Sequence, residues 1–259
     1  MKIHKVTGNQ PFREQDASQT IRGFMLALKD VIGDPDIIVK DCTNYIFSLQ
    51  YTDVMNAPGL RTQHVTSPPG LTSGHGYSGV SQYSRGSFSY CVQYDRSSPT
   101  QEGNMSLWYT KIKNGVLFCI TGDNNATSQF NYEHMSNALI KNTNGHLIHI
   151  CSMPVQNPNY SDTLSQVCVL DITSGVIKYT ASAFDQYLIN DGTVIEDISR
   201  ASIAPFYVPD IGVIDGAYLP VILPKKQDKS FVFTLGDKEY ISMAGFSGTQ
   251  VPVFECGED

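Results

Sequence analysis

The residue types best suited to metal binding or covalent catalysis gather in one short segment, residues 146–151. It holds His146, His149 and Cys151, and a metal site or a Cys-His nucleophile needs such groups within a few ångströms of one another. Successive side chains of a β-strand point to opposite faces, so His149 and Cys151 share one face and His146 lies on the other. The spacing therefore predicts packing within a sheet and no metal or nucleophilic site.

The segment 74–80, with the sequence GHGYSGV, places Ser78 among glycines as a serine nucleophile would be. The nucleophile elbow needs a glycine two residues after the serine, and Val80 stands there instead. His75 has no partner in the local sequence that would make it a base. Because the chain also lacks a phosphate-binding loop and a dinucleotide-binding glycine motif, we expect no cofactor.

Acidic residues keep one enzymatic alternative open. Asp191 lies near Glu196 and Asp197, Asp210 lies near Asp215, and a glycosidase uses two acids on either side of a cleft. Asp191 and Asp215 are each followed by glycine, and Asp-Gly is a common turn dipeptide. The pattern favours turns, with a hydrolase whose acids meet only in the fold as the alternative.

The charge of the chain argues against a nucleic-acid partner. Its 259 residues include 18 basic and 25 acidic side chains, a formal net charge of −7. A phosphate backbone is usually met by clustered lysines and arginines. The only dense basic spot is Lys225, Lys226 and Lys229, which Asp228 interrupts, and this is typical of a solvated loop. We expect no direct nucleic-acid binding.

Neither a membrane anchor nor a secretion signal is expected. The most apolar long segment, residues 203–224, would lose backbone hydrogen bonds as a helix because prolines stand at positions 205, 209, 220 and 224. Residues 1–10 lack the apolar core of a signal peptide. These features predict synthesis in the cytoplasm and no membrane partner.

The thiols and the single tryptophan are expected to be structural. The six cysteines show neither a Cys-x-x-Cys spacing nor the density of a disulfide-stapled domain, and they stand at positions 42, 91, 119, 151, 168 and 256. Trp108 could stack on a sugar if it were exposed, but its place in a strand-like segment favours the core. We expect reduced, buried cysteines and a buried tryptophan.

One amphipathic helix is predicted at residues 17–32. Apolar residues recur there at the spacing of a single buried stripe, namely Ile21, Phe24, Met25, Leu28 and Ile32. Asp16 can cap the start of the helix, and Gly33 followed by Pro35 ends it. Such a helix must cover another element.

Most of the remaining chain predicts antiparallel β-structure. Apolar residues alternate with polar ones at 45–51 and 88–94, and four turn dipeptides predict hairpins: Asn114-Gly115, Asn144-Gly145, Ser174-Gly175 and Gly236-Asp237. For the first hairpin we expect Ile112 opposite Leu117 and Tyr109 opposite Ile120. The predicted fold is mainly β (α+β), with antiparallel, hairpin-rich sheets or a sandwich and one N-terminal helix.

We expect a single β-rich domain over residues 1–259 with a long arm at 56–87. The arm segment is rich in Gly, Ser, Thr and Pro and shows no clear period. A stretch of this length without a period is typical of a functional arm or of a disordered insertion, and ordering it costs about 1 to 2 kcal/mol per residue unless a partner's surface offsets the loss. The segment therefore predicts contacts with a neighbouring subunit.

In general type the chain resembles structural proteins of tailed-bacteriophage virions, such as neck, tail-terminator or baseplate components. The features that carry the resemblance are the acidic chain without a leader, the lead Phe12-Arg13-Glu14 into one helix, the loop 58–86, and hairpins such as KIKNGVLF at 111–118. The resemblance implies many copies arranged symmetrically in a virion, with no cofactor and no catalysis. Its partners would be copies of itself and other virion structural proteins.

The predicted contacts to those partners come from the arm and from the apolar segment 203–224. The candidate interface residues are Pro58, Gly59, Pro68, Pro69, Tyr77, Tyr83, Phe206, Tyr207, Ile211, Tyr218 and Leu219. An alternative function is a receptor- or glycan-binding recognition module that uses the Ser- and Tyr-rich segment 73–94. The hydrolase based on Asp and Glu residues is the second alternative.

Overall fold

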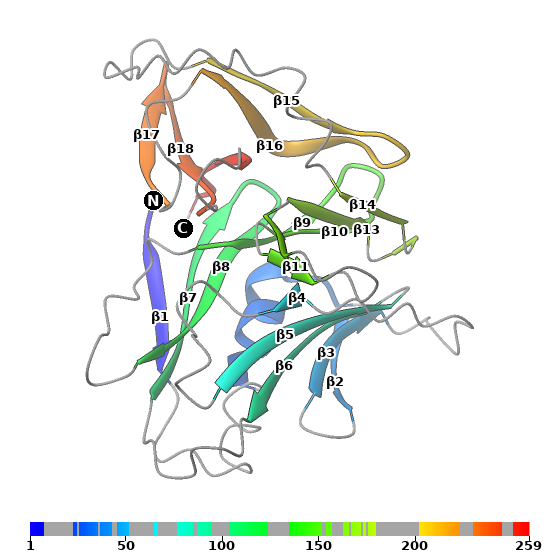
Figure 1. Ribbon diagram of the computed structural model, residues 1–259. Helices are drawn as coiled ribbons and strands as arrows, with labels where there is room; N and C mark the ends of the chain where they lie inside the picture. The colour runs from blue at the N-terminus through cyan, green and yellow to red at the C-terminus, as the bar shows by residue number, and fades with distance from the viewer. Residues whose placement is uncertain are drawn as a thin grey trace.

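The computed structural model of the chain is mainly antiparallel β-structure (Figure 1). It describes residues 1–7, 23–24, 26–35, 37–42, 46–51, 65–66, 77–84, 87–94, 104–123, 135–151, 154–156, 163–165, 167–171, 173–174, 176–179, 202–222, 230–244 and 251–258. Within these residues the strands form three sheets, here called A, B and C, of seven, seven and five strands. The predicted fold class is confirmed.

Sheet A is a meander that the N-terminal strand completes at one edge. Its spatial order is β1-β7-β8-β9-β10-β13-β14. The strands are β1 (Ile3–Thr7), β7 (Asn104–Ile112), β8 (Gly115–Asp123), β9 (Asn137–Lys141), β10 (Leu147–Cys151), β13 (Cys168–Asp171) and β14 (Val176–Tyr179). Every neighbouring pair is antiparallel, and the pairs β7-β8, β9-β10 and β13-β14 are joined by short hairpin connections.

Sheet B is built from the two stretches of chain that interrupt sheet A. Its spatial order is β12-β11-β4-β5-β6-β3-β2. The strands are β2 (Ile37–Cys42), β3 (Ile46–Tyr51), β4 (Val65–Thr66), β5 (Tyr77–Ser84), β6 (Ser87–Tyr94), β11 (Pro154–Gln156) and β12 (Thr163–Ser165). The single pairing of Val155 with Val65 brings the two stretches together.

Sheet C is formed by the C-terminal part of the chain. Its spatial order is β15-β16-β19-β18-β17, and Figure 1 draws it in yellow to red. The strands are β15 (Ser202–Val208), β16 (Gly212–Ile222), β17 (Val232–Leu235), β18 (Lys238–Ser242) and β19 (Val253–Glu255). Two hairpins, β15-β16 and β17-β18, are therefore joined through the short central strand β19.

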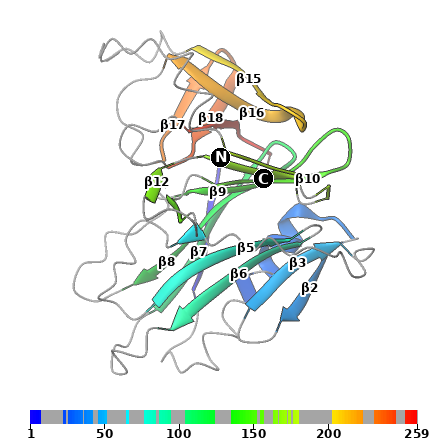
Figure 2. The same cartoon turned by 45° about the vertical axis from the view of Figure 1, so that its right-hand side comes forward.

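Sheet A is the middle layer, because both of its faces are buried. One face packs on sheet C in a single apolar core, to which sheet A contributes Leu117, Ala138, Ile140, Ile148, Ile150 and Val169, and sheet C contributes Phe206, Val208, Ile214, Ile241 and Phe254. The opposite face carries Leu107, Val116, Phe118, Leu139 and Leu147, which are also buried. Both views draw sheet B and the helix on this second side (Figures 1 and 2).

The helix is seen at residues 23–24 and 26–32, inside its predicted range, and Phe24 and Leu28 on it are buried. Gly33 ends it with a φ of 68° and a hydrogen bond from its N–H to the carbonyl oxygen of Lys29. The carboxylate of Asp34 then accepts a hydrogen bond from the ammonium group of Lys141 at 2.7 Å. This ion pair attaches the end of the helix to β9.

All four predicted hairpins are present, but the first has a different register. Ile112 pairs with Gly115 and Tyr109 pairs with Phe118, so the two-residue loop is Lys113-Asn114. Our expected pairs, with Leu117 and Ile120, are therefore wrong by two residues. Asn114 takes the positive φ of 61° that the turn needs, and Gly115 belongs to the strand.

The structure places two strands, β4 and β5, inside the range predicted to be an arm. Residues 77–84 form β5, in which Tyr77 pairs with Tyr94 and Tyr83 pairs with Phe88 of β6. The two interface tyrosines predicted in the arm, Tyr77 and Tyr83, thus lie in a sheet of the chain itself. The other predicted arm residues, at positions 58, 59, 68 and 69, lie outside the described residues.

Candidate functional site

The segment that the sequence singled out for contacts, residues 203–224, forms the hairpin β15-β16 up to Ile222. We call residues 202–222 the contact hairpin. Phe206 pairs with Ile214 and Tyr207 pairs with Val213, but the next ladder pair toward the hairpin base is Pro205 with Tyr218. Asp215, Gly216 and Ala217 thus have no partner on β15 and form a bulge in β16.

The bulge fits against the turn between β7 and β8. Gly216 has a φ of 89°, and a Cβ atom there would lie 3.0 Å from both the Cβ and the carbonyl oxygen of Lys113. Only glycine allows this approach without moving the neighbour. The contact hairpin is therefore docked on the end of sheet A at its bulge.

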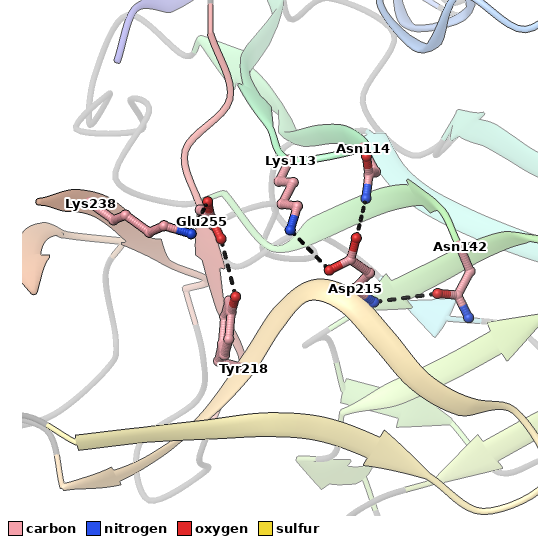
Figure 3. Close-up of polar contacts among 7 residues, drawn as sticks. All are labelled: Lys113, Asn114, Asn142, Asp215, Tyr218, Lys238 and Glu255. Atoms are coloured by element: carbon pink, nitrogen blue, oxygen red, sulfur yellow. Dashed lines mark hydrogen bonds and ion pairs between the residues drawn. The ribbon is translucent and has the colours of Figure 1, made fainter.

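Polar side chains hold this docking in place, and we call Lys113, Asn114, Asn142 and Asp215 the junction (Figure 3). The Asp215 carboxylate accepts hydrogen bonds from Lys113 Nζ at 3.0 Å and from Asn114 Nδ2 at 2.9 Å. The N–H of Asp215 donates to Asn142 Oδ1 at 3.3 Å. The bond from Lys113 is the largest cause of a lowered pKa of Asp215, to which Asn114 contributes.

A second polar group lies further along sheet C and is also drawn in Figure 3. The Glu255 carboxylate accepts hydrogen bonds from Lys238 Nζ at 2.7 Å and from the Tyr218 hydroxyl at 3.1 Å. Burial raises the pKa of Tyr218 to about 12, and Glu255 adds to the rise. The ring of Tyr218 meets Tyr240 edge-on at 5.6 Å. These contacts tie β16, β18 and β19 together.

Backbone pairing closes the same corner between the sheets. Ile112 at the end of β7 forms a bridge with Cys256, just after β19. Lys113 N–H donates to the Glu255 carbonyl oxygen at 2.8 Å, and Gly257 N–H donates to that of Lys111 at 3.1 Å. Sheets A and C are thus linked by main chain as well as by side chains.

The tip of the contact hairpin is pinned to the core. The N–H of Ile211 donates to the carbonyl oxygen of Val208, and the Ile211 side chain is buried with the apolar core. Asp210 and Gly212 take the positive φ values of 67° and 94° that this tight turn needs. The hairpin is therefore fixed at its tip and at its bulge.

The outward face of the fixed hairpin carries two exposed apolar side chains. Tyr207 is 62% exposed and Val213 is 52% exposed, and they are direct cross-strand partners. Paired residues on one face of a ladder lie side by side, so the two form one patch. We call Tyr207 and Val213 the exposed pair.

The other candidate interface residues of this segment lie elsewhere. Phe206, Ile211 and Leu219 pack in or against the core between sheets A and C. Tyr218 packs on the opposite face of sheet C, against Phe233 and Tyr240. Of the five candidates in the hairpin, Tyr207 is the one that solvent reaches freely.

His146 and His149 are on opposite faces of the β10 segment, as strand alternation predicted. His146 Nδ1 lies 2.7 Å from Asp171 Oδ2, while Asp171 Oδ1 accepts the N–H groups of Thr173 and Ser174. The carboxylate orients the imidazole and also stabilises the β13-β14 turn. The side chain of Cys151 lies outside the described part of the structure, so the structure does not place it beside either histidine.

His149 is a buried, neutral histidine. Its Nε2 lies 3.1 Å from Asn137 Oδ1, which can only accept, so Nε2 carries a proton. Complete burial lowers the pKa of His149 to about 3. The neutral imidazole of His149 therefore packs in the buried interior and holds the Asn137 side chain in position.

The structure describes four of the remaining chemical candidates, namely Asp210, Asp215, Cys119 and Cys256. Asp215 is committed to the junction, and Asp210 is exposed in the hairpin turn. Cys119 and Cys256 are not in disulfides; burial raises the thiol pKa of the buried Cys119, and it raises the pKa of the half-buried Cys256 to about 11. Asp191, Glu196 and Asp197 lie outside the described residues.

The described part of the chain offers neither a metal-binding cluster nor a membrane-spanning helix. They contain no group of three or more His, Cys, Asp or Glu side chains that could hold a metal ion. Among those same residues, no helix combines the length and the apolar character needed to span a bilayer.

Comparison of the chain with protein-family models, with curated proteins and with solved structures gives no match in any of the three.

Proposed function

We propose that the chain is a structural subunit of a virion of the tailed-bacteriophage type. In this proposal it is made in the host cytoplasm and assembles as multiple copies in the neck, tail or baseplate, together with other virion structural proteins. The observation that carries the proposal is the exposed pair on the rigid contact hairpin.

The rigidity of the hairpin supports a role in contacts. Exposed neighbouring apolar side chains on a soluble protein mark interaction sites more often than isolated ones do. Ile211 at the tip and Asp215 at the bulge hold the hairpin, so a partner meets a preformed surface and little ordering entropy is lost on binding. This is the behaviour that a repeating assembly contact requires.

Sedimentation velocity of the purified chain over a range of concentrations tests self-association. We expect the double variant Tyr207→Ser/Val213→Thr to associate roughly 10- to 100-fold more weakly than the wild type, since about 1 to 3 kcal/mol of apolar burial is lost. Leu26→Gln is the matched control, because Leu26 is also a large exposed apolar residue but lies on the helix. Equal association of all three proteins would refute the role of the exposed pair.

Electron microscopy tests the particle itself. Antibodies against the chain should decorate one symmetric zone of particles released from cells that produce it. A chain found only as free protein, with all particles unlabelled, would contradict the virion assignment.

A further inference from the structure

Among the described residues the three sheets have six terminal strands, and these differ in how well they are protected against pairing with another chain. Exposed edge strands are commonly protected from pairing with another strand by a lysine, by a proline or by their short length. Four of the six carry such a residue: Lys5 on β1, Lys178 on β14, Lys40 on β2 and Pro205 on β15. The fifth, β12, has only three residues. The sixth strand, β17, has the sequence VFTL and neither lysine nor proline.

The outward backbone groups of β17 follow from its pairing with β18. Ser242 N–H donates to the carbonyl oxygen of Phe231, and the loop after Leu235 has two residues. Hydrogen-bonded and non-bonded pairs alternate along an antiparallel ladder, so Phe233 and Leu235 bond to β18. The N–H and C=O groups of Val232 and Thr234 then point away from the sheet.

The side chains of the same two residues are accessible. Val232 is 41% exposed and Thr234 is exposed, whereas Phe233 between them is buried. Figure 1 shows β17, in orange, at one edge of sheet C. The outer edge of this strand therefore offers backbone groups and small side chains to an approaching strand.

We propose that β17 pairs antiparallel with β17 of a second copy, which joins two C sheets into one continuous sheet. A two-fold axis through Phe233 places Val232 of each copy opposite Thr234 of the other. Each such pair exchanges two hydrogen bonds, so all four outward groups on each strand are satisfied. This inference rests on the proposed assembly function and names one of its contacts.

A second copy is favoured as the occupant because the edge is self-complementary. Its two outward residues are two positions apart, so the same strand turned round by the two-fold axis matches both of them. The strand carries no charge that would repel its copy. Val232 would lie beside Thr234 of the partner and lose its contact with water.

Backbone-directed variants test the pairing by sedimentation of the full chain. Thr234→Pro removes an outward N–H without removing a bond to β18, and it should weaken self-association at least tenfold. Thr234→Val keeps the N–H and is the matched control, which should associate like the wild type. Thermal unfolding of both variants checks that the hairpin is still folded.

Cross-linking tests the register even if the proline variant does not fold. A mixture of Val232→Cys chains and Thr234→Cys chains should form a disulfide dimer on oxidation, because paired residues lie about 5.5 Å apart. Either variant alone should not, since identical positions are then roughly 9 Å apart, beyond the reach of a disulfide. The native cysteines are the same in every sample and serve as the internal control.

The outcomes separate this contact from the assembly proposal. A mixture-specific disulfide, with weaker association of Thr234→Pro, supports the pairing. Association that is lost only in Tyr207→Ser/Val213→Thr, without a mixture-specific disulfide, overturns the β17 contact and leaves the assembly function standing. A chain that stays monomeric in every sample overturns both.

Discussion

Gly115 is a glycine because of its neighbour across the sheet. It has no positive φ, but a Cβ atom there would overlap the carbonyl oxygen of Leu139 and lie 2.9 Å from Ile140 Cα. The strand β8 can approach β9 this closely only where a side chain is missing. Gly115, which the sequence identifies only as part of a turn dipeptide, is thus needed for the close packing of β8 on β9.

Gly115→Ala should destabilise the protein by about 1 to 3 kcal/mol, because β8 and β9 must move apart to admit the new methyl group. Gly23→Ala is the control. Gly23 is helical with nothing within 4 Å of its Cβ position, so alanine should stabilise by about 0.4 to 1 kcal/mol. Urea unfolding measures both changes, and a neutral Gly115→Ala would refute the close approach.

His149 should make stability depend on pH below neutrality. Its pKa is about 3 in the folded chain and 6.5 without burial, so between these values the unfolded state binds more protons. Stability from this group is fully present above pH 6.5 and falls by about 1.4 kcal/mol per unit as the pH drops toward 3.

Urea unfolding of the wild type and of His149→Gln at several pH values isolates this effect, since glutamine can still donate to Asn137 but does not titrate. The wild type should lose stability relative to the variant as the pH falls. The imidazole NMR signals of His149 should stay those of the neutral ring at pH 5. A normal titration near pH 6.5 would refute the burial.

At the scale of elements, a few polar contacts position the contact hairpin and the end of the helix on sheet A. The junction holds the contact hairpin, and the ion pair of Asp34 with Lys141 holds the end of the helix on β9. In that pair the Asp34 side chain is 3% exposed and Lys141 is 47% exposed. The two partners should therefore differ in what their removal costs.

Lys141→Met should destabilise by about 1 to 3 kcal/mol, because it leaves a buried carboxylate without its cation. The double variant Asp34→Asn/Lys141→Met should recover part of this loss, since the amide carries no charge. Thermal unfolding of the two single variants and the double variant measures the coupling. Additive effects would show that the ion pair does not attach the helix.

The elements were predicted better than their registers. The helical spacing of apolar residues located the helix, and turn dipeptides located all four hairpins, because these signals are local. The register of the first hairpin depended on the contact of Gly115 with β9, which is 24 residues away along the chain at Leu139. No local pattern carries that information.

At the scale of the whole molecule, the contact hairpin packs one face on the core and exposes the other to solvent. Phe206 is fully buried between sheets A and C, and its neighbour Tyr207 is largely exposed. Stability and assembly should therefore be separable by substituting adjacent residues.

Phe206→Ala should destabilise the chain by about 3 to 5 kcal/mol through the cavity it leaves. Tyr207→Ser should change the free energy of unfolding by less than about 1 kcal/mol, because Tyr207 contributes little to the core. Differential scanning calorimetry on dilute, monomeric samples measures both. A large loss of stability in Tyr207→Ser would mean that this residue belongs to the fold and not to a contact surface.

The sequence by itself determined the helix, the four hairpins at turn dipeptides and which segment is unusually apolar, since these follow from periodicity and turn chemistry. It did not determine which apolar residues of that segment face outward. The bulge at Asp215 to Ala217 breaks the alternation of β16, so Ile214 and Ala217, three residues apart, both pack in the core between sheets A and C, while Tyr218 packs on the other face of sheet C. Only the tertiary structure decided this, because the bulge exists where Gly216 meets Lys113, a residue of another sheet.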